Sequence, residues 1–141
     1  MDAKKYLVAV IAVFVMYSAA AYVIHNMILA PDYEAITSAL RGEKEFLQRL
    51  PLLYLGNLIF ALAFCLIYAK GYEAPKHWFG QGIRYGLILG TLLAPVAFAE
   101  YVAYPVPGTL ALKWIVFGYL QALLSGVVVA AVYQPPPQST G

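Results

Sequence analysis

Four long apolar runs constrain the fold of this 141-residue chain more than any other feature of its sequence. They cover approximately residues 6–29, 51–69, 83–104 and 110–133, and each is bounded by charged residues, proline or glycine. A helix that crosses a bilayer needs about 20 mostly apolar residues. None of the runs alternates polar and apolar residues as a barrel strand would, and a helix satisfies its backbone hydrogen bonds internally. The sequence therefore predicts an all-α integral membrane four-helix bundle.

The composition supports the same prediction. Hydrophobic residues make up 62% of the chain and charged residues 11%, whereas an average soluble domain has about 45–50% and about 25%. A chain this small cannot hide so much apolar surface from water, because small domains leave much of their surface exposed. The net charge is only +2 and the longest basic run is Lys4-Lys5. We therefore expect membrane lipid as the surroundings and no nucleic acid as a partner.

Basic residues in the loops predict the orientation of the spans. If the N-terminus is cytoplasmic, five basic residues lie inside and four lie outside. The inside set is Lys4, Lys5, Lys70, Lys76 and Arg84, and the outside set is Arg41, Lys44, Arg49 and Lys113. This distribution favours a multi-pass protein with both termini in the cytoplasm.

Two segments are expected to lie outside the spans. In the first loop, Asp32 can cap an interfacial helix over about residues 32–41, with Tyr33, Ile36 and Leu40 on one face and Gly42 as its end. An alternative interpretation of this loop is a docking surface for a partner. The segment 134–141, with three consecutive prolines, predicts a flexible or extended tail.

Small residues recur every four positions in the third and fourth runs. The repeats are Gly82, Gly86, Gly90 and Ala94 in the third run, and Gly118, Ala122, Gly126 and Ala130 in the fourth. Small residues let helices in lipid approach closely, which is a main source of their association. The pattern predicts a tightly packed antiparallel pair of helices within one chain. The alternative is that the same stripe joins two copies of the protein.

The two halves of the chain show a short similarity. The segments YSAAAYVIH and VAFAEYVAY align Tyr22 with Tyr101 and Val23 with Val102. This match is consistent with two repeated helical hairpins related by an axis along the membrane normal. Chance similarity between apolar segments is the alternative explanation.

The few polar residues of the spans gather toward one side of the membrane. In the orientation above, all of them fall in the outer half: His25, Asn26, Asn57, Glu100, Lys113 and Gln121. Polar groups in a membrane usually face the bundle interior. We therefore expect an apolar inner half and a polar outer vestibule, with His25 opposite Glu100. The alternative is that these residues lie at headgroup level, solvated or paired with Lys113, and simply end their helices.

No motif in the sequence predicts catalysis or a cofactor. Cys65 is the only cysteine, and His25 and His77 are expected on opposite sides of the membrane, so no zinc or bis-histidine haem site is expected. The glycines after Gly80 do not form a phosphate-binding loop, and no Gly-x-Ser-x-Gly elbow occurs. We expect no metal, no cofactor and no catalytic residue.

The stretch His25-x4-Ala-Pro-x-Tyr33, with GNLIFALAFCLIYAKGYE and GIRYGLILG further along, resembles a group of small four-span bacterial membrane proteins. The resemblance extends over nearly the whole chain and implies the four-span topology and a bacterial inner membrane, but no activity. The sequence therefore favours a non-enzymatic accessory or structural subunit of a larger membrane complex, with other membrane subunits or a homo-oligomer as partners. The alternative is a small transporter or a lipid- or quinone-binding protein that uses the polar vestibule.

Overall fold

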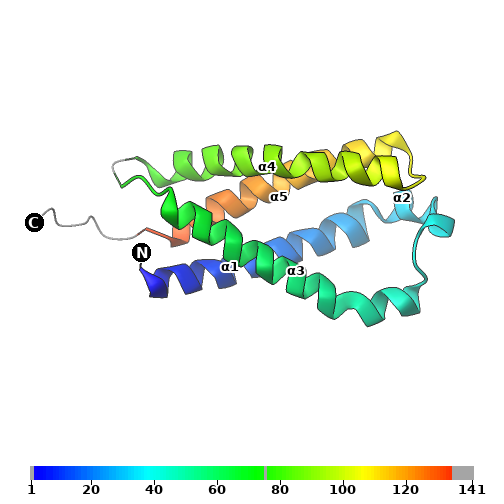
Figure 1. The fold of residues 1–141 in the computed structure, drawn as a ribbon, viewed down its shortest axis with the longest axis horizontal. Helices are drawn as coiled ribbons and strands as arrows, with labels where there is room; N and C mark the ends of the chain where they lie inside the picture. The colour runs from blue at the N-terminus through cyan, green and yellow to red at the C-terminus, as the bar shows by residue number, and fades with distance from the viewer. Residues whose placement is uncertain (1, 75, 135–141) are drawn as a thin grey trace, which may run out of the picture.

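A computed structural model describes residues 2–74 and 76–134, and these residues contain helices and no β-strand. Four helices run most of the length of the molecule (Figure 1). They are α1 (Ala3–Val23), α3 (Glu43–Lys70), α4 (Trp78–Ala103) and α5 (Gly108–Val132). Each is long and apolar enough to cross a membrane, counting the continuation of α1 to Ile28. The predicted all-α four-helix membrane architecture is confirmed.

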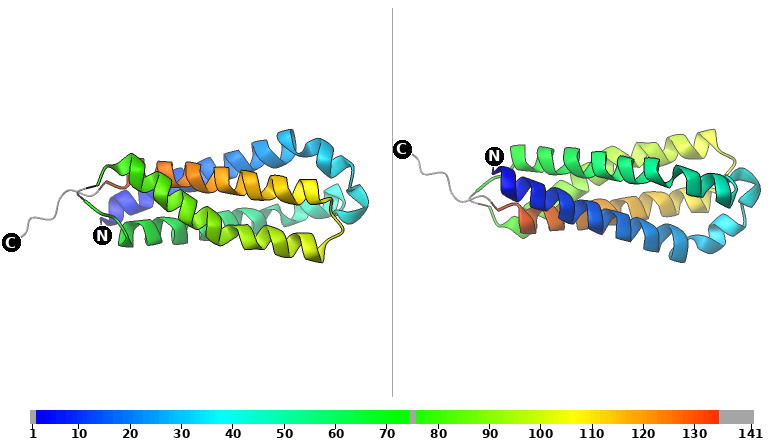
Figure 2. Two further views of the ribbon diagram at one scale, coloured as in Figure 1. Left: turned by 90° about the horizontal axis from the view of Figure 1, so that it is seen from above. Right: turned by 90° about the horizontal axis from the view of Figure 1, so that it is seen from below.

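Short helical segments fill the first loop. The helix α1 continues into a π-helical turn, η1 (Ile24–Ile28), which is followed by α2 (Ala30–Glu34) and a 3-10 turn, η2 (Thr37–Ala39). This loop and the α4–α5 connection lie at one end of the bundle, which we call the loop end (Figures 1 and 2). The start of α1, the end of α5 and the α3–α4 connection lie at the other, terminal end (Figures 1 and 2).

The helices form two antiparallel hairpins, α1 with α3 and α4 with α5, and the hairpins meet mainly where α1 packs on α5. The α4–α5 hairpin is the tighter one, because glycines face backbone there. A Cβ atom placed on Gly82 would lie 2.6 Å from the carbonyl oxygen of Gly126, and one on Gly86 would lie 2.7 Å from that of Ala122. No side chain fits into so narrow a gap, so these positions require glycine.

The small-residue pattern does not describe the whole α4–α5 contact. A Cβ on Gly118 would meet no atom within 4 Å, so that glycine does not support close packing as expected. Next to Gly90 lies the ring of Tyr119, 2.7 Å from the position of a Cβ, rather than a small residue. Ala94 is only half-buried, whereas Ala97 is buried. The close approach is therefore confined to the terminal half of the hairpin, because α5 presents large side chains toward the loop end.

The α1–α3 hairpin packs through larger side chains. The rings of Tyr17 and Phe60 lie 4.4 Å apart, and the Asn57 amide donates a hydrogen bond to the Ser18 hydroxyl across 3.1 Å. In Figure 1, α3 crosses α1 and diverges from it toward the loop end. The two hairpins therefore differ in how their helices pack, and the duplication of one hairpin stays a prediction.

The larger apolar core lies at the terminal end. Phe64 and Tyr68 of α3 and Tyr133 after α5 are almost completely buried. The Tyr85 ring packs edge-on against Phe64, and its hydroxyl donates to the Phe64 carbonyl oxygen across 2.6 Å. Within the spans, aromatic and aliphatic side chains dominate this end, in agreement with the predicted apolar inner half.

The predictions for the first loop were partly wrong. The second long helix begins at Glu43 rather than near Pro51, because the polar segment before the proline is helical and Glu45 pairs with both Arg41 and Arg49. Pro51 lies inside this helix, where it removes one backbone hydrogen bond. No continuous helix covers residues 32–41.

Two residues expected to bound that loop helix have other roles. Asp32 lies within α2 and its carboxylate accepts two hydrogen bonds from the Lys113 ammonium, at 2.6 and 2.8 Å. Gly42 is the N-cap residue of α3 rather than the end of a preceding helix. The expected tail, apart from Gln134, lies outside the described residues.

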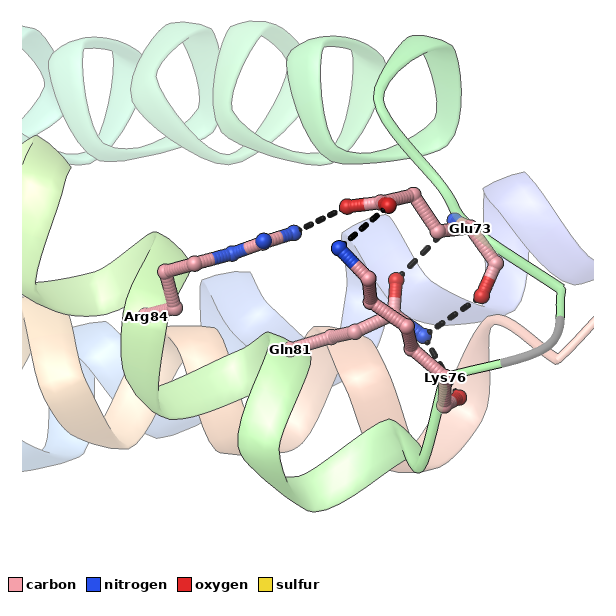
Figure 3. Close-up of polar contacts among 4 residues, drawn as sticks. All are labelled: Glu73, Lys76, Gln81 and Arg84. Carbon is pink, nitrogen blue, oxygen red and sulfur yellow. Dashed lines mark hydrogen bonds and ion pairs between the residues drawn. The ribbon is translucent and has the colours of Figure 1, made fainter.

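The short α3–α4 connection is held by Gln81 (Figure 3). This buried side chain accepts a hydrogen bond from the Glu73 backbone N–H across 3.0 Å and donates to the carbonyl oxygens of Glu73 and Lys76, at 2.9 and 2.8 Å. The Glu73 carboxylate in turn pairs with Lys76 and Arg84. Hydrogen bonds from Lys76 and Arg84 keep the pKa of the Glu73 carboxyl below its usual value. The Gln81 amide satisfies backbone groups that the connection would otherwise leave without partners.

Candidate functional site: a cavity at the loop end

An open cavity of about 840 Å³ lies at the loop end of the bundle. All four long helices and the first loop contribute to its lining. The lining residues with aromatic, polar or charged side chains are Tyr17, His25, Tyr33, Arg41, Glu45, Glu100, Tyr104, Trp114, Phe117 and Gln121. The cavity therefore combines a largely aromatic wall with a few polar groups, and it lies where the sequence predicts a polar vestibule.

A chain of hydrogen bonds forms one wall of the cavity. The indole nitrogen of Trp114 lies 2.8 Å from the Tyr33 hydroxyl oxygen, and that oxygen lies 2.6 Å from Nδ1 of His25. An indole N–H can only donate, so the Tyr33 oxygen accepts from Trp114. The Tyr33 hydroxyl can donate to Nδ1 of a neutral His25, which then carries its proton on Nε2.

The π-helical turn η1 positions His25 beside Tyr33. In this turn the backbone N–H of Leu29 bonds to the Ile24 carbonyl oxygen five residues earlier, across 2.8 Å. Ile24 and Leu29 are buried in a small apolar cluster with Ile36 and Leu110, which fixes the turn on α5 and the loop. π-helical turns inside α-helices are rare and are frequently found at functional sites.

Burial of the Tyr33 ring raises the pKa of its phenol, the hydrogen bond from Trp114 lowers it in part, and the negative charges of Glu100 and Asp32 raise it to a lesser degree than burial. The phenol therefore keeps its proton throughout the physiological pH range. The contribution from Glu100 also places its carboxylate in the electrostatic neighbourhood of Tyr33.

The charges around the cavity are not balanced. Arg41 and Glu45, which both line it, form an ion pair with one another, and Glu45 also pairs with Arg49. Lys113 pairs with Asp32, not with Glu100. Within residues 2–74 and 76–134, no hydrogen-bond donor or cation is paired with the Glu100 carboxylate.

Gln121 lies deeper in the cavity than the charged groups. It is only 6% exposed, and its amide nitrogen is 3.5 Å from the Tyr17 carbonyl oxygen, at the limit for a hydrogen bond. The Ser125 hydroxyl donates to the Gln121 backbone carbonyl oxygen across 2.7 Å. The Gln121 side chain is thus a buried polar group held by one long contact.

The structure brings together three of the five residues that the sequence predicts for a polar pocket. His25, Glu100 and Gln121 line the cavity. Asn26 instead donates to the Tyr22 carbonyl oxygen on its own helix, across 3.2 Å, and Asn57 is used between α1 and α3. Neither asparagine is among the lining residues.

Sequence reasoning missed the aromatic wall. Tyr33 was expected only on one face of the loop helix, and the predicted pocket did not include Tyr17, Tyr104, Trp114 or Phe117, because position in a helix does not say which rings converge. The spacing His25-x7-Tyr33 is the one local signal that could have indicated a contact. Trp114 is 81 residues from Tyr33, so no sequence pattern connects them.

In the part of the chain that the structure describes, no three His, Cys, Asp or Glu side chains are grouped so that they could hold a metal ion. The arrangement can instead bind a small molecule through aromatic rings, one carboxylate, one imidazole N–H and one amide. No family model, curated protein or solved structure matches the chain.

Proposed function

We propose that this multi-pass membrane protein binds a small amphipathic molecule in the cavity at the loop end, as a lipid- or quinone-binding protein or a small transporter. The observation that supports this proposal is the combination of cavity size and lining. Ligand sites typically have volumes of about 300–1,000 Å³ and mostly apolar walls with a few convergent polar groups. The cavity of about 840 Å³, with Glu100, His25 and Gln121 among aromatic rings, fits that description.

The experiment uses Gly118, which lines the cavity and has open space around the position of a Cβ atom. Gly118→Leu should fill the cavity without displacing a neighbour. Gly56→Leu is the control, because Gly56 also has no atom within 4 Å of a Cβ but is not among the lining residues. In Trp78→Phe protein, Trp114 is the single tryptophan and reports on the cavity by fluorescence.

Decylubiquinone and a short-chain phosphatidylcholine serve as probes in an uncharged detergent. For at least one of them, we expect saturable quenching or enhancement of Trp114 fluorescence, an affinity at least tenfold lower in Gly118→Leu, and no change in Gly56→Leu. Equal affinities in all three proteins would contradict binding in this cavity, and no saturable signal with either probe would contradict a lipid- or quinone-binding role.

A second candidate function is that of a small accessory subunit of a larger membrane complex. The supporting observation is the amount of apolar α3 surface that no other helix covers, including Leu52, Leu55, Ile59 and Ile67. Gentle detergent extraction followed by native mass measurement tests this role. Co-purification of a different membrane protein in fixed stoichiometry would support this role. A homo-oligomer would restrict the partner to a second copy of the chain, and a monodisperse monomer would contradict the role.

We further propose that the membrane is the bacterial inner membrane and that both termini are cytoplasmic. The support is the small excess of basic residues at the terminal end, five against four at the loop end. In Cys65→Ser protein, single cysteines introduced at His77 and at Thr37 can be labelled in intact cells with a membrane-impermeant maleimide. Labelling at residue 37 and not at residue 77 is expected, and the reverse pattern would invert the topology.

A further inference from the structure

We infer that the ligand of the loop-end cavity is an amphipathic organic cation, with an ammonium group held by Glu100 and the aromatic wall. This inference rests on the proposed function and specifies the chemical class of the ligand. It follows from the charge of the lining residues, from the aromatic rings among them and from the apolar α4 residues that line one side of the cavity.

The first step is the charge of the lining. Arg41 and Glu45 both line the cavity and form an ion pair, and Glu45 also pairs with Arg49, which is not among the lining residues. The neutral form of His25 can accept a hydrogen bond from the Tyr33 hydroxyl. Glu100 is the remaining charged group among the lining residues and has no partner among the described residues, so the lining residues alone, with a neutral His25, have a formal charge of −1. A carboxylate within a membrane protein is costly unless it is paired or reached by water, and it often marks a site for a cation.

The second step is the wall around this carboxylate. Five of the lining residues are aromatic: Tyr17, Tyr33, Tyr104, Trp114 and Phe117. The faces of such rings attract cations, and the attraction increases when the cation is removed from water. Quaternary ammonium groups in particular are recognised by aromatic rings, because the ring quadrupole attracts the cation without a hydrogen bond. An anionic headgroup would be repelled by Glu100, and an uncharged one would gain at most a hydrogen bond from it.

The third step is the apolar part of the ligand. Leu93 and Val96 of α4 line the cavity beside Ala97, and both side chains are exposed. An alkyl chain or aromatic tail can therefore extend from the cavity along α4 into the bilayer. The whole site fits a cationic head within the protein and an apolar tail that remains partly in lipid.

Benzyltrimethylammonium, benzenesulfonate and benzyl alcohol are matched probes for the test, since they share a ring and differ in charge. The full chain with Trp78→Phe is titrated in maltoside detergent, and Trp114 fluorescence is followed. We expect saturable binding of the cation that is at least tenfold tighter than binding of either other probe. Glu100→Gln should weaken binding of the cation at least tenfold and leave benzyl alcohol unchanged.

Glu34→Gln is the matched control, because Glu34 is an exposed carboxylate in α2 that does not line the cavity. If Glu100→Gln fails to fold, Tyr104→Leu replaces it, with the same expected selective loss of cation binding. Unchanged cation affinity in the Glu100 or Tyr104 variant would overturn the inference. Preferential binding of benzyl alcohol or benzenesulfonate would also overturn the inference. If Gly118→Leu abolished that binding, the proposed function would still stand. No saturable binding of any probe, including decylubiquinone and phosphatidylcholine, would overturn both.

Discussion

The Tyr33 hydroxyl oxygen forms a hydrogen bond with Nδ1 of His25 across 2.6 Å and so connects the short helix α2 to the π-helical end of the first span. The same hydroxyl accepts from Trp114 of α5, across 2.8 Å. One side chain of the first loop therefore joins two spans.

Tyr33→Phe should loosen this wall of the cavity. The change removes two hydrogen bonds and leaves the Trp114 N–H without its acceptor, for a loss of about 1–3 kcal/mol. We expect a lower thermal midpoint and, in Trp78→Phe protein, a shifted Trp114 emission maximum. Tyr22→Phe is the control, because Tyr22 is 63% exposed and forms no side-chain hydrogen bond among the described residues. Identical spectra and midpoints in both variants would refute the role given to Tyr33.

Gly86→Ala should destabilise the α4–α5 hairpin. The new Cβ would lie 2.7 Å from both the Ala122 carbonyl oxygen and the Leu123 Cα, and backbone atoms cannot move away without separating the helices. Overpacking of this kind costs about 1–3 kcal/mol. Gly56→Ala, where a Cβ meets no atom within 4 Å, should leave the thermal midpoint equal or higher. Wild-type stability of Gly86→Ala would show that the helices do not approach this closely.

The α3–α4 connection should loosen in acid. Hydrogen bonds from Lys76 and Arg84 lower the pKa of the Glu73 carboxyl, so ionised Glu73 stabilises the fold. When the pKa is lower in the folded state, this stabilisation is complete above the pKa of the unfolded state, about 4.3, and is lost as the pH falls through the pKa of the folded state. Lower protection against amide exchange in the connection below pH 4, relative to the intrinsic rate at each pH, is the expected result. Glu73→Gln should make this protection independent of pH in this range, and Glu34→Gln should not.

Asp32→Asn should free the first loop from α5. Asp32 accepts from Lys113 at 2.6 and 2.8 Å, and both side chains are partly exposed. Such pairs contribute about 0.2–1 kcal/mol, so the effect should be local rather than global. Limited proteolysis between Thr37 and Gly42 should become faster, with no further acceleration when Lys113→Met is added. Additive effects of the two changes would mean that the residues do not interact.

The spans could be predicted from sequence more completely than the site. Long apolar runs dictate helices in lipid, and the recurrence of Gly82, Gly86 and Gly126 indicated where two of them approach. The start of α3 was misplaced by eight residues. Pro51 is a strong local signal for the end of a helix, whereas the sequence gives only a weak signal of the Glu45 ion pairs that support the helix before Pro51. The polar pocket was predicted from the depth of polar residues alone, and depth does not distinguish Asn57, which faces α1, from Gln121, which lines the cavity.

The amino-acid sequence by itself determined that this chain forms four apolar helices, because a bilayer offers backbone groups no partner outside the helix. It also determined which end of the bundle holds the polar side chains, since their positions along each span set their depth. Only the tertiary structure decided which of them meet. The contact of His25 with Tyr33 depends on a π-helical turn, and that of Tyr33 with Trp114 depends on how residues 81 positions apart pack, which local sequence does not encode.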